Sequence, residues 1–148
     1  MAPPAPRSAS RSDLIVSFRA MLLDVVGRLA RREAEKARAA AKKGQAAFGS
    51  WVEAFYTGDE EGVYRDCLAP ALAFGMAALG SEGDAREVAG GFARAYMERS
   101  KTDLQELPAR EVGQAVPRLL KRWETARTAE VVGEIIAAVA AEEKVNAA

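Results

Sequence analysis

The chain has 148 residues and carries 21 basic and 21 acidic side chains. Nearly half of it (49%) is apolar, but 32 residues are alanine, and Leu, Ile, Val and Phe together number only 31. That share lies just above the level of about 20% below which disorder is expected, and the zero net charge does not drive the chain to expand. We therefore expect one folded domain of ordinary size with a thin core.

Several kinds of chemistry are excluded by residue type. The chain has no histidine, so by itself it cannot form a Ser-His-Asp triad, a Cys-His pair or a histidine zinc site. The single cysteine, Cys67, allows neither an internal disulfide nor a cysteine cluster for a metal. We predict a protein that is not an enzyme and has no catalytic residue, metal site or cofactor.

The N-terminal residues 1–12 hold three of the six prolines and are predicted to form a flexible tail. Residues 13–148 then form a single helical domain. Ser12 is expected to cap the first helix, with Asp13 in its first turn.

The first helix is predicted to run for about 30 residues and to stop at Gly44. Its first half carries an apolar stripe at spacings of three and four residues. Its second half lacks large apolar residues, so it should project from the core or pack through alanine. Because a long helix with so little core tends to bury its stripe against another molecule, we assign the stripe to self-association or to a protein partner. The residues assigned are Leu14, Ile15, Phe18, Leu22, Val25 and Leu29.

Further helical segments follow in order. A short segment covers residues 48–56. The next covers residues 63–78, with Cys67 as a buried, inert thiol on its apolar face, and Pro70 should kink or interrupt it. Asp84 should cap another helix, which the glycines at 90 and 91 weaken.

The C-terminal third begins after a break at Leu107-Pro108. It contains two apolar stripes, over residues 112–123 and 131–139, which belong either to one long helix or to two; Pro117 is expected near a first turn. No stretch alternates with a period of two between turn residues. The predicted fold class is therefore all-α: an antiparallel bundle of about five or six helices.

Charge is uneven along the chain, with a net +6 over residues 1–43 and −6 over residues 44–148. The basic part of the first helix offers candidates for phosphate contact, which would suit a small nucleic-acid-binding packaging or regulatory factor. The alternative, a solvated helix face, is favoured because this stretch has no aromatic residue for base stacking. The candidate residues are Arg28, Arg31, Arg32, Lys36, Arg38, Lys42 and Lys43.

Aromatic residues gather between residues 48 and 64. They suit a patch for a partner, but in a chain with few bulky side chains we favour them as core. They are Phe48, Trp51, Phe55, Tyr56 and Tyr64.

Three segments resemble the C-terminal helical region of portal proteins of tailed bacteriophages of the HK97-type group. The first is the leucine-rich stretch 22–34 with its paired arginines. The second is Trp51-Val52-Glu53-Ala54-Phe55-Tyr56 with the stretch 64–72, and the third is Arg122-Trp123-Glu124-Thr125-Ala126-Arg127. The resemblance covers about residues 14–140.

The resemblance implies an accessory helical part of the dodecameric ring through which phage DNA is packaged and ejected. It implies virion or host cytoplasm as the location, with other virion proteins or copies of the chain as partners. Independently of the resemblance, no membrane is expected, because the longest apolar stretches are far short of the about 20 residues that span a bilayer. A whole portal protein is several times longer and has a wing, stem and clip, so ring assembly and tail attachment are not carried over to this chain.

Overall fold

A computed structural model describes residues 10–147, and within them it is helical, with no strand. This confirms the predicted all-α antiparallel bundle. A 3-10 turn (Ala109–Glu111) precedes α5, and a π-helical turn (Trp123–Arg127) joins α5 to α6. The α-helices are α1 (Arg11–Lys42), α2 (Gln45–Thr57), α3 (Glu60–Leu79), α4 (Ala85–Gln105), α5 (Val112–Arg122) and α6 (Thr128–Ala147).

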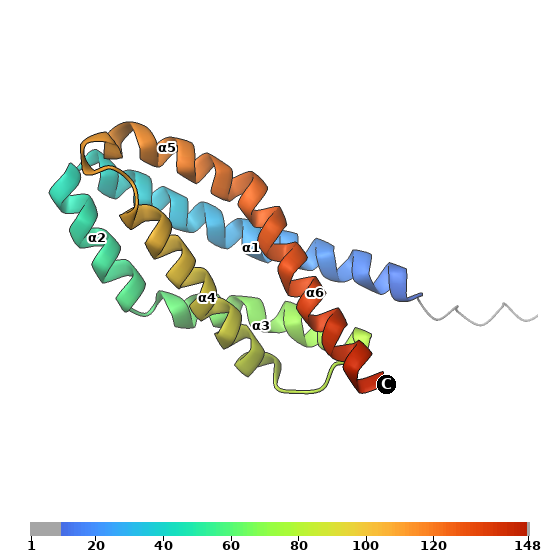
Figure 1. Cartoon of the computed structure of the whole chain (residues 1–148). Helices are drawn as coiled ribbons and strands as arrows, with labels where there is room; N and C mark the ends of the chain where they lie inside the picture. The colour runs from blue at the N-terminus through green and yellow to red at the C-terminus, as the bar shows by residue number, and fades with distance from the viewer. Residues whose placement is uncertain (1–9, 148) are drawn as a thin grey trace, which may run out of the picture.

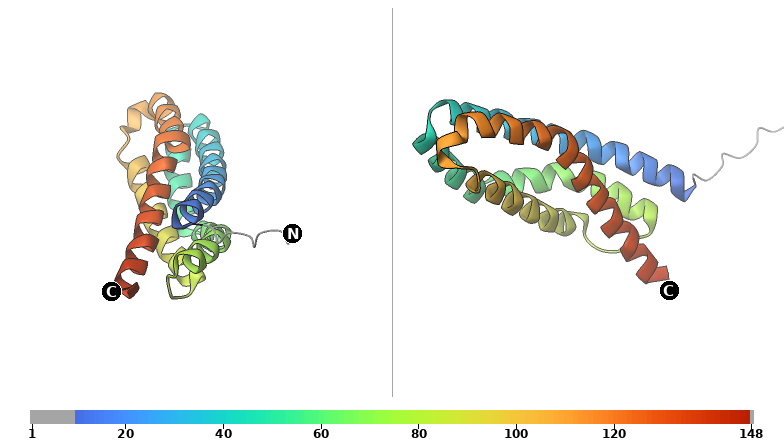
Figure 2. Two further views of the ribbon diagram at one scale, coloured as in Figure 1. Left: turned by 90° about the vertical axis from the view of Figure 1, so that its right-hand side faces the viewer. Right: turned by 45° about the horizontal axis from the view of Figure 1, so that its top comes forward.

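The helices form four rods that run back and forth along the long axis of the molecule (Figures 1 and 2). The first rod is α1, and α2 with α3 returns along it. The third is α4, and the fourth is α5 with α6, which bends where the two helices join. No helix in the described part of the chain has the length and apolar composition needed to cross a membrane.

The helix ends follow local capping rules, with one correction. Ser10, not Ser12, caps α1: its Oγ accepts a hydrogen bond from the backbone N–H of Asp13 at 3.1 Å. The helix therefore begins at Arg11, inside the predicted tail, whose residues 1–9 lie outside the described part. The predicted cap at Asp84 is confirmed, since its Oδ1 accepts from the N–H of Arg86 at 2.9 Å.

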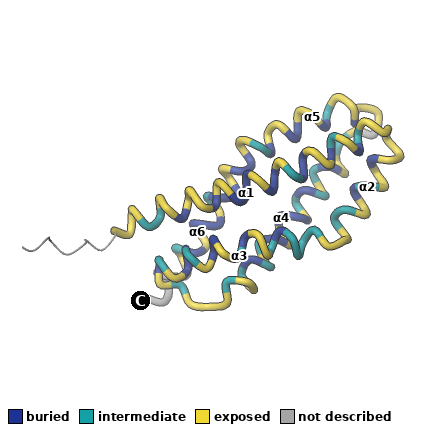
Figure 3. The backbone as a smooth tube through the Cα atoms, turned by 180° about the vertical axis from the view of Figure 1, so that it is seen from behind, coloured by how far each residue is buried: buried dark blue, intermediate teal, exposed yellow. Residues whose placement is uncertain are grey.

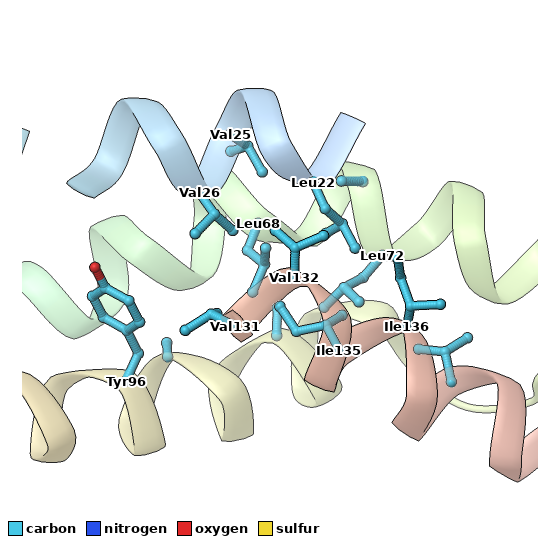
Figure 4. Packing of buried hydrophobic residues seen from close by; sticks show 14 of the residues in the cluster. Leu22, Val25, Val26, Leu68, Leu72, Tyr96, Val131, Val132, Ile135 and Ile136 are labelled. Atoms are coloured by element: carbon cyan, nitrogen blue, oxygen red, sulfur yellow. The ribbon is translucent and has the colours of Figure 1, made fainter. Parts of the chain in front are cut away.

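Two apolar clusters fill the bundle. The larger one joins the first half of α1 to α3, α4 and α6, and Leu22, Val132 and Ile136 are among its members (Figure 4). The smaller one joins the second half of α1 to α2, α5 and Trp123, and there α1 contributes only alanines: Ala34, Ala37 and Ala40. The second half of α1 thus packs through alanine, which was one of the two expected outcomes.

The structure corrects the expectation for Cys67 in α3. Cys67 is exposed, because the buried face of α3 is centred on Leu68 and Leu72, one residue further along the helix than the face predicted to contain Cys67. Pro70 lies inside α3 without interrupting it, and a kink there stays a prediction. In α5, Pro117 also stands beyond the first turn, five residues after the helix begins at Val112.

Close approach of α1 and α3 depends on a glycine. The fully buried ring of Phe18 lies against Gly75, where an added Cβ would overlap the ring. Gly91 on α4 differs, because a Cβ built there has no neighbour within 4 Å.

We expect opposite effects from the same substitution at these two helical glycines. Gly75→Ala should lower the free energy of unfolding by about 1–3 kcal/mol, because the methyl group overpacks the core against Phe18. Gly91→Ala should raise it by about 0.5–1 kcal/mol through helix propensity alone. Chemical denaturation of both variants measures this, and changes of the same sign would contradict the packing described.

Candidate functional site

The stripe assigned to partners in the sequence is mostly used by the chain itself. Four of its six residues are buried in the larger cluster: Phe18, Leu22, Val25 and Leu29. The other two, Leu14 and Ile15, are half-buried. In this conformation the stripe holds α1 to α3 and α6, so it is not a free surface.

A different face of α1 is exposed. Among residues 10–141, the exposed large apolar side chains are Val16 (66% exposed), Leu23 (42%) and Met21 (38%), all in the first half of α1. Much of this half of the helix is exposed (Figure 3). Val16 and Leu23, together with the exposed Ala20, lie on one side of the helix, opposite Phe18 and Leu22. We call Val16, Ala20 and Leu23 the outer face. Further along the same side of α1, Ala34 is buried in the smaller cluster.

Three of the seven basic candidates are paired with acids. Arg28 contacts Asp24 at 3.0 Å, Arg38 contacts Glu124 at 3.2 Å, and Arg32 makes a two-pronged contact with Glu60. Within the described residues the other four form no ion pair and remain exposed: Arg31, Lys36, Lys42 and Lys43. The three acids lie on α1, on α3 and in the π-helical turn, whereas Glu33, within the basic stretch, pairs with Arg127 instead.

Two of the unpaired lysines border a groove between α1 and α2. The groove has a volume of about 590 Å³, and alanines and Ser50 form part of its lining. Lys36 and Lys43 lie on its α1 side, and Trp51 and Phe55 lie on its α2 side. The two rings are stacked with centroids 4.8 Å apart and are half-buried. Folding thus supplies the aromatic residues that the basic stretch lacks in sequence.

The most unusual site in the molecule is a buried ion pair between α1 and the π-helical turn. Nη2 of Arg127 lies 3.0 Å from Oε1 of Glu33, and both side chains are nearly inaccessible to solvent. Nη1 of Arg127 donates to Oγ of the buried Ser100 at 2.9 Å. The guanidinium lies over the rings of Trp123 and Tyr96, with its carbon 3.7 and 4.4 Å from their centroids.

Tyrosines complete the hydrogen bonding of the Glu33 carboxylate. The hydroxyl of Tyr56 donates to Oε2 at 2.6 Å, and that of Tyr96 donates to Oε1 at 3.1 Å. Tyr96 belongs to the larger apolar cluster, Trp123 to the smaller one, and Tyr56 packs against both. The polar cluster of Glu33, Arg127 and their partners therefore forms the boundary between the two cores.

The π-helical turn positions Trp123 and Arg127 together. Its widened geometry adds a residue to the turn, and such bulges frequently occur at functional sites. Thr128 Oγ1 donates to the carbonyl of Trp123 at 2.6 Å, which satisfies one of the carbonyls that the widened turn affects. As a result, α5 and α6 continue as one bent rod, which resolves the open alternative of one long C-terminal helix or two.

Burial dominates the acid–base properties of this cluster. Desolvation raises the pKa of the Glu33 carboxyl, and the charge of Arg127 and the hydrogen bond from Tyr56 oppose that rise. Burial also raises the pKa of Tyr56 and of Tyr96, and the negative charge of Glu33 raises both further. The pKa of Tyr64, which stacks on Tyr96 at 4.4 Å, is raised mainly by burial.

The arrangement favours a structural role for these charges. Beside Trp123 and Arg127 lies an open hollow of about 410 Å³, but its charges are matched: Arg99, for example, contacts Glu130 at 3.0 Å and Glu134 at 3.6 Å. Among the described residues, no three side chains of the kinds that bind metals gather at one place.

Sequence reasoning missed the polar cluster, although a signal was present. Glu33 stands four residues after Leu29 and four before Ala37, at a position where the stripe of α1 demands a buried residue. Arg127 stands in the same way between Trp123 and Val131. A charge at a core position on each of two helices predicts that they meet, because a buried charge needs a partner.

We expect strong coupling between Glu33 and Arg127. Arg127→Met should lower the free energy of unfolding by about 3–5 kcal/mol, because it leaves the carboxylate of Glu33 buried without its counterion. Combining it with Glu33→Leu should restore part of that loss, so that the double variant is more stable than Arg127→Met alone. Denaturation of the two single variants and the double variant gives the coupling energy; additive losses would contradict the pairing.

The three tyrosines of the chain should resist ionisation in the folded protein. Because the pKa of each is raised above the unfolded value of about 10, the folded state keeps protons that the unfolded state loses. This contribution to stability is complete below about pH 10 and is lost as the pH rises above it. In an alkaline titration, phenolate absorbance should rise only together with loss of helical circular dichroism. If phenolate absorbance rises with a pKa of about 10 while the protein is still helical, at least one tyrosine is exposed.

Comparison with models of protein families, with curated proteins and with solved structures gives no match. The geometry described above is therefore the basis of the functional argument.

Proposed function

We propose that this chain is a non-enzymatic interaction module that docks through the outer face of α1, as an accessory helical part of a phage portal involved in virion assembly and DNA packaging. The observation that carries the docking role is the gathering of every exposed large apolar side chain of the described residues on the first half of one helix. An apolar surface confined to one element is typical of a contact with another protein.

The packing under this surface supports the proposal. On the opposite side of α1, Phe18 and Leu22 are fully buried, so the helix is held in place before any partner binds. A preordered surface loses little conformational entropy on docking. The first segment of the portal resemblance, residues 22–34, lies on the same helix. The charges of the buried polar cluster are compensated within the chain, so that cluster does not compete with the outer face as the docking site.

The test uses rings of a full-length portal protein of an HK97-type phage. We expect the purified chain to bind rings of that protein and Leu23→Glu to weaken binding more than tenfold, because a charge replaces an apolar group that binding buries. Ala73→Glu, an exposed site on α3, is the matched control and should bind normally. Sedimentation with the rings measures both. Absence of binding by the wild type, or equal binding by the two variants, would overturn the proposal.

A second candidate function is supported by the groove between α1 and α2. Two lysines without acidic partners stand there beside the half-buried rings of Trp51 and Phe55. Cations next to aromatic rings are the elements with which proteins hold single-stranded nucleic acid. This arrangement supports nucleic-acid binding as the alternative role of the basic first helix.

For this alternative we expect a thymidine oligonucleotide to bind at low salt and to be released as salt rises. The double variant Lys36→Glu/Lys43→Glu should lose at least tenfold in affinity. Arg118→Glu/Lys121→Glu, which makes the same charge change at exposed sites on α5, should behave as the wild type. A titration followed by tryptophan fluorescence measures the three proteins, and no binding by the wild type at low salt would eliminate this function.

A further inference from the structure

We infer that the outer face of α1 takes as its partner the same face of a second copy of this chain, with the two α1 helices antiparallel and the two Ala20 residues close to the two-fold axis. The inference rests on the proposed docking role of this face and names its partner. Three observations carry it: the order of residue sizes on the face, the charges along one edge of it, and the point at which the face becomes covered.

The sizes of the side chains on the outer face suit pairing with itself. The small Ala20 stands between the larger Val16 and Leu23, four residues after the first and three before the second. In an antiparallel pair centred near Ala20, the two alanines allow close approach of the helices. Val16 of each copy then lies level with Leu23 of the other, so that each exposed apolar side chain gains an apolar neighbour.

The charges along one edge of the face favour the antiparallel direction. Asp13 lies at the beginning of this edge, and Arg31 lies on the same side of the helix five turns later. Both are exposed, and neither forms an ion pair with another described residue. In the register that sets Val16 level with Leu23, Asp13 of each copy lies level with Val26 of the other, and the guanidinium of Arg31 reaches back to that level, since its Nη1 lies 3.6 Å from a Cβ built on Gly27. A parallel pair would instead place Asp13 against Asp13.

The covered part of α1 sets the limit of the pairing. On the same side of the helix, Gly27, Ala30 and Ala34 are buried, so the outer face is uncovered only from the beginning of α1 to about Val26, near where α6 crosses α1 (Figure 2). The uncovered part of the face is about four helical turns long. The area that so short a face can bury is less than the about 800 Å² per partner of a standard interface. We therefore expect a weak dimer, strengthened where an assembly holds copies side by side.

Cysteine crosslinking tests both the contact and its direction. The exposed Cys67 is first replaced (Cys67→Ser), and Val16→Cys and Leu23→Cys are made separately in that background. Under oxidation, a mixture of the two variants should yield at least tenfold more mixed disulfide dimer than either variant alone yields of its own dimer. Ala73→Cys, on α3, is the control for random collision.

Each outcome has a definite meaning. If each variant forms more disulfide dimer with itself than with the other variant, the helices pair in parallel. If the yields do not exceed that of Ala73→Cys, the face does not pair with itself. Either result overturns the inference. The sedimentation assay with portal rings is independent. Ring binding without crosslinking leaves the docking role intact with a different partner, whereas crosslinking without ring binding leaves the self-pairing and overturns the portal role.

Discussion

The ion pair of Glu33 and Arg127 is the constraint on which the arrangement of the helices depends. Two charges taken out of water need each other and further hydrogen bonds, and here the partners of the Glu33 carboxylate and of both Nη atoms of Arg127 come from α1, α2, α4 and the π-helical turn. The buried Nε of Arg127 has no partner among the described residues. A shift of any of these helices along its axis would leave a buried charge or hydroxyl without its partner. An apolar contact would tolerate such a shift far better, so the polar cluster fixes the register of the bundle.

This constraint matters because the rest of the core is thin. Where α1 meets the smaller cluster it offers only alanines, which pack closely but lack distinctive shape. Where α1 meets α3, the closest approach is that of one ring over one glycine, Phe18 against Gly75, within the larger apolar cluster. A core made of small residues gains dispersion energy from close approach, but many sliding arrangements have similar energy. The buried polar layer separates the correct arrangement from the others.

The polar cluster also influences which face of α1 is exposed, because it lies at the bend between α5 and α6. The π-helical turn that brings Arg127 to Glu33 also marks the bend between α5 and α6 (Figure 1). Because of that bend, α5 runs beside the second half of α1 and α6 crosses toward α3 and α4. The first half of α1 therefore keeps its outer face uncovered. The buried ion pair and the exposure of the outer face thus have a common structural origin.

The sequence by itself determined the helices, because the spacing of apolar residues, the capping residues and the breaks are local. It correctly located α1, the cap at Asp84 and the break before α5. Some local errors remained: Ser12 was chosen over Ser10, and the face of α3 was displaced by one residue, which buried Cys67 in the prediction and exposes it in the structure. Neighbouring residues on a helix are separated by only about 100°, so a ragged apolar stripe leaves the buried side ambiguous.

Only the tertiary structure decided which surfaces are free. The stripe that contains Phe18 and Leu22 was expected to bind a partner, but these side chains are buried in the cluster with α3 and α6. The exposed side of α1 is the one that carries Val16 and Leu23. Likewise, only folding brings Trp51 to the groove that Lys43 borders, and only folding brings Glu33 within hydrogen-bond distance of Arg127, 94 residues away in the chain. Periodicity describes one helix at a time, whereas burial is a property of the pair, and which helix covers which depends on packing summed over the whole bundle.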